Sequence, residues 1–288
     1  LNSEWKFVGP AFYQREIVIP ADWEDCETEM FLERVMWQSR VWVDGMEVSS
    51  PEDSLVTPHT HRLGKLSPGK HDLIVRVDNR MIHPIGDKGH AYGGQTQSLW
   101  NGIVGRIELR PVAKNHISSI RVFPSMDGNV KVEVNGNFSG DLMLHADCAE
   151  LERTEKPVDF ALGNAKGGQV ILTGRAARQP ETWSEFSPTR YVVGVSLKDR
   201  FGKMLDRKVA AFGFREVKAE GNKLLINGTP TFMRGNLECA VFPKTGYPPV
   251  DVESWRRIWR IYQNHGLNHA RFHSWCPPEA AFTAADEL

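Results

Sequence analysis

From Trp5 to about Gly213 the sequence consists of short runs of alternating apolar and polar residues, and turn residues separate these runs. Val130, Val132 and Val134, for example, alternate with charged or polar neighbours. This period of two is that of a strand with one buried face, and it differs from the 3.6-residue period of a helix. The pattern therefore restricts about the first two thirds of the chain to β-structure.

The runs up to about Pro111 predict one β-sandwich of the jelly-roll kind, residues 1–111. An Asp44-Gly45 pair between two of them predicts a tight hairpin, because glycine accepts the positive φ that such a turn requires. Ile103, Ile107 and Leu109 are its expected core residues in the last run. The predicted strands are 12–19, 29–36, 40–43, 46–48, 70–77 and 99–109.

A second all-β block, residues 112–213, predicts an immunoglobulin-like sandwich of about a hundred residues. The cysteine–tryptophan–cysteine signature of antibody domains is missing, so only the architecture is predicted. Its alternating positions continue at Leu142 and Leu144 and, on one face of a later strand, at Tyr191, Val193, Val195 and Leu197. Residues 170–172 form another short apolar run.

From Phe214 the pattern changes to strand, helix, strand, helix, which predicts parallel pairing. The segments are a small hairpin at 224–228, a buried strand at 231–234, a helix at 252–265, a strand at 267–272 and a helix at 278–288. Asp251 is placed to cap the first helix and Gly266 to end it in a left-handed turn. A (β/α)8 barrel needs about 250 residues, so residues 214–288 hold only its beginning.

Composition excludes several functional classes. A formal net charge of −1, with 35 basic and 36 acidic residues, favours neither nucleic acid nor an anionic membrane surface. The sequence contains neither a run long enough for a membrane span nor an initial signal peptide. The four cysteines lack the CxxC spacing of zinc sites, so we expect isolated thiols, no metal and no cofactor. His59-x-His61 would place two rings on one strand face, but without further spaced ligands we expect ordinary loop and surface histidines.

Several motifs, in this order and spacing, resemble those of glycoside hydrolase family 2, the group with β-galactosidases, β-glucuronidases and β-mannosidases. The resemblance implies the same three-domain order: sugar-binding-like jelly roll, immunoglobulin-like sandwich and catalytic barrel. The motifs are VWVDGMEV at 41–48, HDLIVRVDNR at 71–80, WNGIVGRIEL at 100–109, FGFREV at 212–217, INGTPTFMRGN at 226–236, GLNHARFHSW at 266–275 and AADEL at 284–288.

The sequence departs from the family pattern at both predicted barrel strands. Many relatives have Arg-x-Ser-His at the end of the second strand, where this chain has Arg271-Phe272-His273-Ser274. A histidine moved by one residue turns to the other face of a strand. The usual Gly-x-Asn-x-His of the first strand is Gly235-Asn236-Leu237-Glu238-Cys239 here. These differences indicate a distinct subgroup, whose sugar preference cannot be taken from the familiar members.

The resemblance implies a retaining glycosidase that removes terminal β-linked sugars, β-galactosidase-like or β-glucuronidase-like, from an oligosaccharide or glycoside, without a cofactor. The family's two catalytic glutamates would follow Leu288, so we expect no catalytic residue in this chain and no activity from it alone. Glu279, Asp286 and Glu287 are expected on a solvated helix face. Many relatives act outside the cytoplasm, which leaves a periplasmic or secreted location as an expectation from the family alone.

Residues at the ends of the predicted barrel strands are the candidates for sugar contact, because barrel active sites form there. Arginine and histidine can hydrogen-bond hydroxyls or a carboxylate, and tryptophan can stack on a sugar ring. The alternative is a structural arginine–carboxylate pair and a core tryptophan. The Gly-rich stretch Gly86 to Gln97 either reaches the barrel mouth or is a connector. The candidates are Asn236, Glu238, Arg271, His273, Ser274 and Trp275.

Two other functional classes remain open from the sequence. The first sandwich can be a non-catalytic carbohydrate-binding module, since fold alone does not establish function. Alternatively, both sandwiches brace the barrel and support oligomers. An aromatic platform with polar neighbours on the first sandwich would favour carbohydrate binding. The oligomeric state is left open, with a homo-oligomer among the alternatives.

Overall fold

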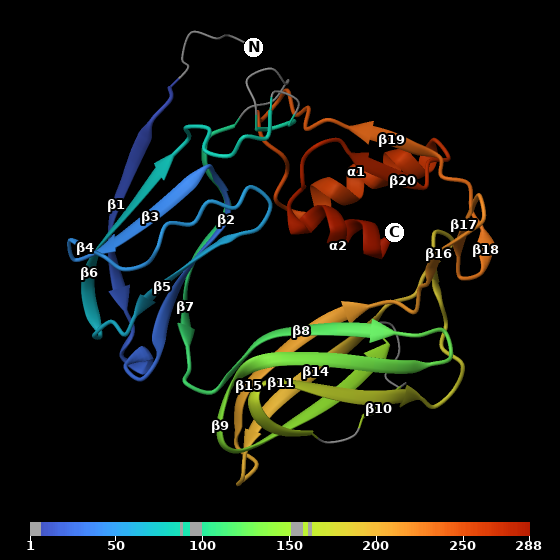
Figure 1. Cartoon of the computed structure of the whole chain (residues 1–288), viewed down its shortest axis with the longest axis horizontal. Helices are drawn as coiled ribbons and strands as arrows, with labels where there is room; N and C mark the ends of the chain where they lie inside the picture. Colours follow the sequence, from blue (N-terminus) through green and yellow to red (C-terminus); the bar gives the residue numbers. More distant parts are fainter. Residues whose placement is uncertain (1–6, 87–88, 93–99, 151–157, 161–162) are drawn as a thin grey trace. The chain divides into compact units, whose positions relative to one another are not determined.

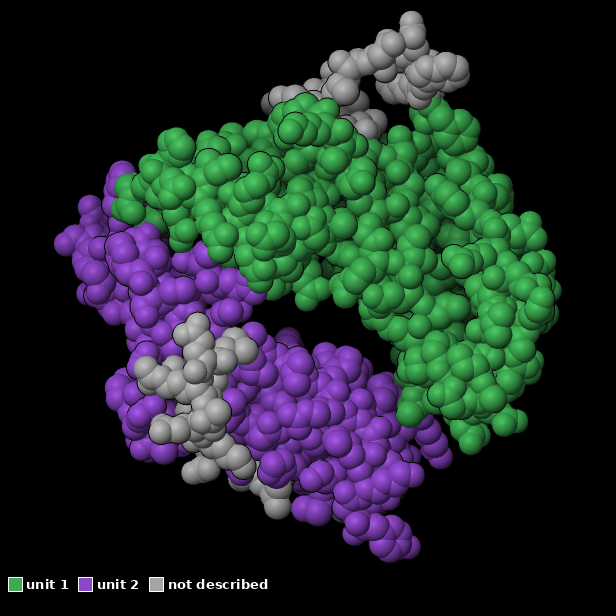
Figure 2. Space-filling view, turned by 180° about the vertical axis from the view of Figure 1, so that it is seen from behind, with its two compact units in different colours: residues 1–113, 234–285 green, residues 114–233, 286–288 purple. Residues whose placement is uncertain are grey.

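The computed structural model describes residues 7–86, 89–92, 100–150, 158–160 and 163–288. The chain is mainly β-structure, as predicted, with two α-helices near its end (Figure 1). Two compact units are formed, one by residues 1–113 and 234–285 and the other by residues 114–233 and 286–288 (Figure 2). Among the described residues, neither helix is long and apolar enough to cross a membrane. The division at residues 111 and 213 into three domains stays a prediction.

Two sheets of the first unit enclose one apolar core, with a short 3-10 helix η2 (Ala21–Trp23) between β1 and β2. One sheet has the order β1-β6-β3-β4 and the other β5-β2-β7, with antiparallel pairing throughout. The jelly-roll name for this sandwich stays a prediction. The strands are β1 (Pro10–Ile19), β2 (Glu27–Met36), β3 (Gln38–Val43), β4 (Met46–Glu47), β5 (His59–Gly64), β6 (Gly69–Asp78) and β7 (Gly102–Val112).

Side-chain alternation explains the core of this sandwich. Val41 and Val43 are buried whereas Trp42 between them faces outward, as the period of two requires. The predicted hairpin is confirmed, because Asp44 and Gly45 have φ of 51° and 82°. Ile107 was expected in the core but is 56% exposed, because β7 is an edge strand with a neighbour on one side only.

The second unit is built on a six-stranded antiparallel sheet with the order β10-β11-β9-β14-β15 and β8 paired to β9. The long strand β9 pairs with β8 and β11 in its first half and mainly with β14 in its second half. Every predicted core position of this block that alternates along β9 and β14 is buried. The strands are β8 (His116–Pro124), β9 (Asn129–Glu150), β10 (Val158–Phe160), β11 (Gly163–Ala176), β14 (Tyr191–Asp199) and β15 (Met204–Phe212).

Two small sheets complete the second unit. The hairpin predicted at residues 224–228 is present, as β17 turns at Asn227-Gly228 into β18. The immunoglobulin-like name for the larger sheet stays a prediction. These short strands are β12 (Trp183–Ser184), β13 (Ser187–Pro188), β16 (Val217–Glu220), β17 (Lys223–Ile226) and β18 (Thr229–Pro230).

The end of the chain forms two strand–helix units: β19 (Gly235–Glu238), α1 (Val252–Asn264), β20 (His269–Phe272) and α2 (Glu279–Glu287). The two strands are parallel, as predicted. Asp251 caps α1 by accepting from the amide of Ser254, and Gly266 has a φ of 71°.

The predicted position of the first barrel strand, residues 231–234, is wrong by about four residues. The apolar Phe232 suggested a buried strand but is 79% exposed. Pairing with β20 begins instead at Gly235, opposite His269. Asn236 and Glu238, expected after the strand, therefore lie within β19.

Candidate functional site

The two faces of the β19–β20 pair have different environments. Asn236 lies opposite Ala270 and Glu238 opposite Phe272, so these four side chains share one face. That face meets α1, because the Asn236 amide donates to the Tyr262 hydroxyl at 3.0 Å. The other face presents Leu237 and Arg271, which are both exposed.

An aromatic cluster fixes the helix side of this strand pair. The Phe272 ring lies 6.1 Å from Trp255 and 6.0 Å from Trp259 of α1, and 6.1 Å from Phe282 of α2, between ring centroids. Trp275 adds a perpendicular contact at 5.4 Å. Edge-to-face pairs of this kind stabilise beyond simple burial. The cluster therefore sets the orientation of β20 and of the residues after it.

Trp275 is 8% exposed, and its indole Nε1 donates to the main-chain oxygen of Glu238 at 3.0 Å. Its ring packs on Phe242 and Phe272. This environment is that of the core tryptophan considered as the alternative above. Its expected stacking on a sugar ring stays a prediction.

The carboxylate of Glu238 turns back on its own chain. Its Oε1 accepts from the main-chain amide of Ala240 at 2.8 Å. Burial raises the pKa of this carboxyl, although the amides of Ala240 and Val241 oppose the rise. The group thus holds the turn after β19.

Arg271 and Ser274 are the exposed members of the candidate set near the end of β20. Arg271 points from the open face of the strand pair, where a closed barrel has its interior. Ser274 has a φ of 58°, a conformation that few residues other than glycine adopt. Contact of either residue with a sugar stays a prediction.

Cys239 and His273 follow β19 and β20 directly, and the thiol lies 3.8 Å from the imidazole Nδ1. His90 joins them, with its ring centroid 4.8 Å from that of His273. Residues 89–92 of the Gly-rich stretch thus reach the strand ends; the rest of that stretch, apart from Gly86, lies outside the described residues. Sequence analysis missed Cys239 and His90 here, because their separation follows no ligand spacing.

The expectation that His59 and His61 lie in loops or at the surface is wrong. Both rings are buried in β5, because serine hydroxyls and a main-chain carbonyl pair with their nitrogens. Nε2 of His59 lies 2.9 Å from the Ser54 carbonyl, which only accepts, so His59 carries its proton there. Its Nδ1 then accepts from Ser39, and the same hydroxyl accepts from Nε2 of His61, each at 2.7 Å. Nδ1 of His61 accepts from Ser49 at 2.6 Å. Both rings are therefore neutral, and all four ring nitrogens are used within the protein.

The acidic residues of α2 are held by arginines or packed at the helix end. Glu279 was expected on a solvated face; it is largely exposed and pairs with Arg106 at 3.1 Å. Glu287 pairs with Arg190 at 3.3 Å and is only 16% exposed, so its expected solvation is wrong. Both carboxylates thus pair α2 with arginines of other segments.

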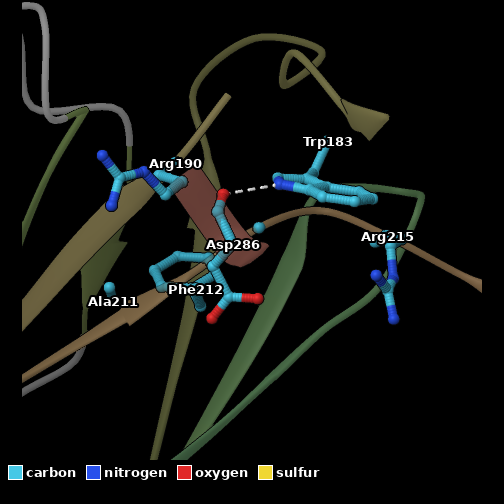
Figure 3. Close-up of a pocket in the computed structure, with 7 residues that line it drawn as sticks. Trp183, Arg190, Ala211, Phe212, Arg215 and Asp286 are labelled. Atoms are coloured by element: carbon cyan, nitrogen blue, oxygen red, sulfur yellow. Dashed lines mark hydrogen bonds between the residues drawn. The ribbon is translucent and has the colours of Figure 1, made fainter. Parts of the chain in front are cut away.

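A small hollow of about 100 Å³ lies in the second unit beside Asp286 (Figure 3). The indole of Trp183 donates to the main-chain oxygen of Asp286 at 2.8 Å, and the Arg215 guanidinium lies 4.8 Å from the indole ring. Ligand pockets for drug-sized molecules measure about 300–1,000 Å³. This hollow is too small to hold a disaccharide.

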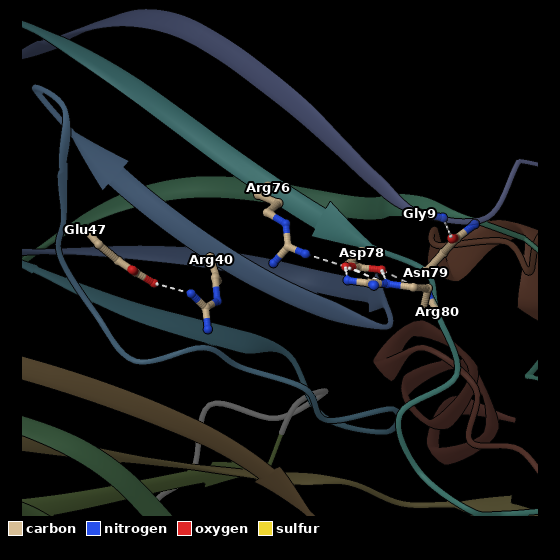
Figure 4. A network of polar contacts seen from close by, with 7 residues as sticks. All are labelled: Gly9, Arg40, Glu47, Arg76, Asp78, Asn79 and Arg80. Atoms are coloured by element: carbon tan, nitrogen blue, oxygen red, sulfur yellow. Dashed lines mark hydrogen bonds and ion pairs between the residues drawn. The ribbon is translucent and has the colours of Figure 1, made fainter.

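The outer face of the β1-β6-β3-β4 sheet carries an aromatic pair with polar neighbours. Ring centroids of Phe12 and Trp42 are 6.5 Å apart. Arg76 lies opposite Phe12 on β6 and binds Asp78, while Arg40 on β3 pairs with Glu47 of β4 at 3.5 Å (Figure 4). This face, defined by Phe12, Trp42, Arg40 and Arg76, is called the outer aromatic face below.

Comparison with known proteins supports one family. The family model described as glycosyl hydrolases family 2 matches residues 115–215. A β-glucuronidase of Paenibacillus borealis is 24% identical over 246 residues, covering 79% of this chain and 40% of that protein. A β-galactosidase of Alteromonas mediterranea is 24% identical over 261 residues, covering 82% of this chain and 24% of that protein. The chain thus spans less than half the length of these relatives.

Solved structures share the fold. A β-glucuronidase of Bacteroides uniformis superposes with a TM-score of 0.79 and 20% identity, covering 98% of this chain and 35% of that chain. A β-glucuronidase from Ruminococcus gnavus gives a TM-score of 0.76 and 17% identity, covering 98% of this chain and 48% of that chain. Nearly the whole chain therefore shares its fold with a part of each of these proteins.

Proposed function

Because the chain belongs to the family 2 glycosyl hydrolases, we propose that the protein removes terminal β-linked sugar residues from oligosaccharides or glycosides. The reaction is a double displacement with retention, which requires two carboxyl groups about 5 Å apart. Both carboxylates lie on barrel strands outside these 288 residues. This chain contributes the two sandwiches and the first two strand–helix units.

The parallel β19–β20 pair is the observation on which this proposal depends. Its open face carries Arg271, and its carboxyl ends carry Cys239 and His273. Carboxyl ends of barrel strands surround the active site in known barrel enzymes. Arg271 binds sugar hydroxyls or a sugar carboxylate through its fork of N–H donors.

The relatives suggest two substrate classes, β-glucuronides and β-galactosides. The exposed guanidinium of Arg271 suits a uronic acid, because arginine binds carboxylates through two parallel hydrogen bonds. A β-glucuronide is therefore the first substrate to test.

The test compares the 288-residue chain with the same protein extended through the complete barrel. Both are assayed on a panel of chromogenic β-glycosides that includes the glucuronide, galactoside and mannoside. We expect hydrolysis of at least one member by the extended protein and of none by the short chain. Turnover by the short chain would contradict the placement of the carboxylates, and inactivity of both on the whole panel would contradict the enzymatic function.

Carbohydrate binding by the outer aromatic face is a second candidate function. Phe12 and Trp42 form an apolar platform, and Arg40 and Arg76 provide donors beside it. Sugar rings stack on such platforms while their hydroxyls accept from the flanking donors. The test is binding of the whole chain to a glycan array, with Phe12→Ala and Trp42→Ala.

Phe201→Ala is the matched control, since this phenylalanine is 80% exposed in a turn of the other unit. Loss of glycan binding in the first two variants, but not in the control, supports the binding function. If no glycan is retained, the binding function is contradicted.

A further inference from the structure

His90, Cys239 and His273 form a cluster of three metal-ligating side chains in the first unit. Each offers one ligand atom, and these atoms lie within 4.8 Å of one another. The cluster combines two imidazoles with one thiol, and none of the three is fully exposed. Residues from three separate segments converge here: a loop after β6 and the turns that follow β19 and β20.

The spacing of the ligand atoms fits a tetrahedral ion. Zn–S bonds of about 2.3 Å and Zn–N bonds of about 2.0–2.1 Å place a bound sulfur and nitrogen about 3.6 Å apart. The Cys239 Sγ to His273 Nδ1 distance is 3.8 Å. Movements of the three ligand atoms by a few tenths of an ångström to about one ångström would bring them to the distances of a bound ion.

Backbone strain marks the same three positions. The residue after each ligand has a left-handed conformation: Ala91 has a φ of 65°, Ala240 of 57° and Ser274 of 58°. Each such non-glycine residue costs on the order of 1–3 kcal/mol and is typical of functional sites. Alanine has no side-chain hydrogen bond to offset that cost. Three of the five non-glycine positive-φ residues among those described therefore adjoin this cluster.

Hydrogen bonds hold the three turns in place. The Tyr92 hydroxyl donates to the Leu55 carbonyl at 3.1 Å and accepts from the Cys276 amide. The amide of His273 donates to the main-chain oxygen of Glu238 at 2.8 Å. The cluster is thus preorganised by contacts outside it, as metal sites require.

One ring nitrogen of the cluster lacks a partner. Nδ1 of His90 is buried and makes no hydrogen bond within the described residues. Leaving a buried polar nitrogen unpaired costs about 1–3 kcal/mol, so such a group requires an explanation. A bound ion supplies this explanation, because it aligns the His90 ring and brings a water or substrate oxygen within reach of Nδ1.

We propose that His90, Cys239 and His273 bind one thiophilic transition-metal ion, for which Zn²⁺ is the best match. Thiolate and imidazole donors select such ions over Mg²⁺ or Ca²⁺, which prefer oxygen. Three protein ligands leave a fourth position open, as in catalytic zinc sites. Two of the ligands, Cys239 and His273, directly follow the parallel strands β19 and β20.

A thiol beside one imidazole is also the arrangement of an activated nucleophile. The second imidazole favours the metal, because a nucleophile needs only one base. The two alternatives differ in their response to Zn²⁺. A bound ion protects the Cys239 thiolate from alkylation, whereas an activated nucleophile stays reactive.

The test uses the 288-residue chain, stripped with a chelator and titrated with Zn²⁺ and, separately, with Co²⁺. We expect one ion per chain and a thiolate-to-cobalt charge-transfer band. Zn²⁺ should also slow alkylation of Cys239 at least tenfold, with Cys26 in the same molecule as an unprotected reference. Absence of stoichiometric binding, or equal alkylation with and without Zn²⁺, would overturn the proposal.

Variants locate the ion at this cluster. Cys239→Ser and His90→Gln should each weaken Zn²⁺ binding at least about a hundredfold, because even outer-shell changes cost 10–100-fold. Cys26→Ser and His265→Gln, which alter a thiol and an imidazole elsewhere, should leave binding unchanged. Melting temperatures of the metal-free variants check folding. Full affinity in folded His90→Gln would overturn the site.

Discussion

The guanidinium of Arg34 on β2 donates a hydrogen bond to the main-chain oxygen of Pro277, just before α2. A second guanidinium nitrogen donates to the Leu55 carbonyl at 3.3 Å. Arg34 is only 7% exposed, and its guanidinium also lies 3.7 Å from the Cys276 sulfur, so its charge is stabilised by acceptors within the protein. One side chain thereby ties the first sandwich to the barrel segment within the first unit.

Replacing Arg34 by methionine should lower the free energy of unfolding of this unit by about 2–3 kcal/mol. The reason is that the carbonyl of the buried Pro277 loses its guanidinium donor, while the Leu55 carbonyl keeps the Tyr92 hydroxyl and methionine fills the space. Arg34→Lys keeps the charge but reaches fewer acceptors. Its free energy of unfolding should lie between those of Arg34→Met and the native chain. Urea unfolding curves check this, and an unchanged midpoint in Arg34→Met would show that the bond adds no stability.

The serine-linked pair of His59 and His61 predicts a loss of stability in acid. Burial lowers the pKa of both rings, that of His61 to about 4 from 6.5. The unfolded chain therefore binds protons first as the pH falls, and stability is lost between pH 6.5 and 4. For His61 alone this amounts to about 2 kcal/mol at pH 5.

The measurement is urea unfolding at pH 7 and pH 5 for the native chain and for His61→Gln. Glutamine retains a donor and an acceptor toward Ser39 and Ser49 but does not titrate. Between pH 7 and pH 5 the free energy of unfolding of His61→Gln should therefore fall by about 2 kcal/mol less than that of the native chain. Equal losses in both proteins would show that His61 does not titrate as its burial requires.

For His71 we predict a pH dependence of folding stability with the opposite sign. A hydrogen bond from its Nδ1 to the Asp44 carboxylate, at 2.7 Å, raises the pKa of the imidazole. The contribution of this hydrogen bond to folding stability is complete below pH 6.5, and it is lost as the pH rises through the pKa of His71 in the folded protein. Asp44→Asn keeps the left-handed turn residue and the bond to the Asp72 amide but removes the charge. NMR titration should then show the His71 pKa falling, and an unmoved pKa would exclude Asp44 as the cause.

The sequence was sufficient to predict the sandwich strands, because one buried face imposes a period of two. Val193 and Val195 on β14 are fully buried, as their alternation requires. The first barrel strand was misplaced because β19 has only four residues, of which Leu237 alone is a large apolar residue, so no alternation marks it. The predicted strand contained the apolar Phe232, whereas the pairing of β19 with β20 begins at Gly235, opposite His269.

The candidate site was only partly predictable for a related reason. The end of the second barrel strand near Arg271 followed from the strand–helix pattern, whereas the end of the first at Glu238 did not, because that strand was predicted at residues 231–234. The approach of His90 to His273 depends on how two sandwich sheets and a barrel segment pack, which no local spacing records. Trp275 could equally be a core or a binding residue from its sequence, and only its contacts with Phe242 and Phe272 distinguish its surroundings.

Arg271 is the residue whose substitution should affect hydrolysis most without affecting folding. It is exposed on the open face of β20, so Arg271→Met should leave the melting temperature unchanged. Loss of a charged hydrogen bond to substrate, about 1.5–3 kcal/mol, should lower kcat/KM of the extended protein about 10–100-fold. His269→Gln is the matched control, because His269 shares this face but lies at the opposite end of the strand. Unchanged kcat/KM in Arg271→Met, or an equal loss in the control, would remove Arg271 from the substrate site.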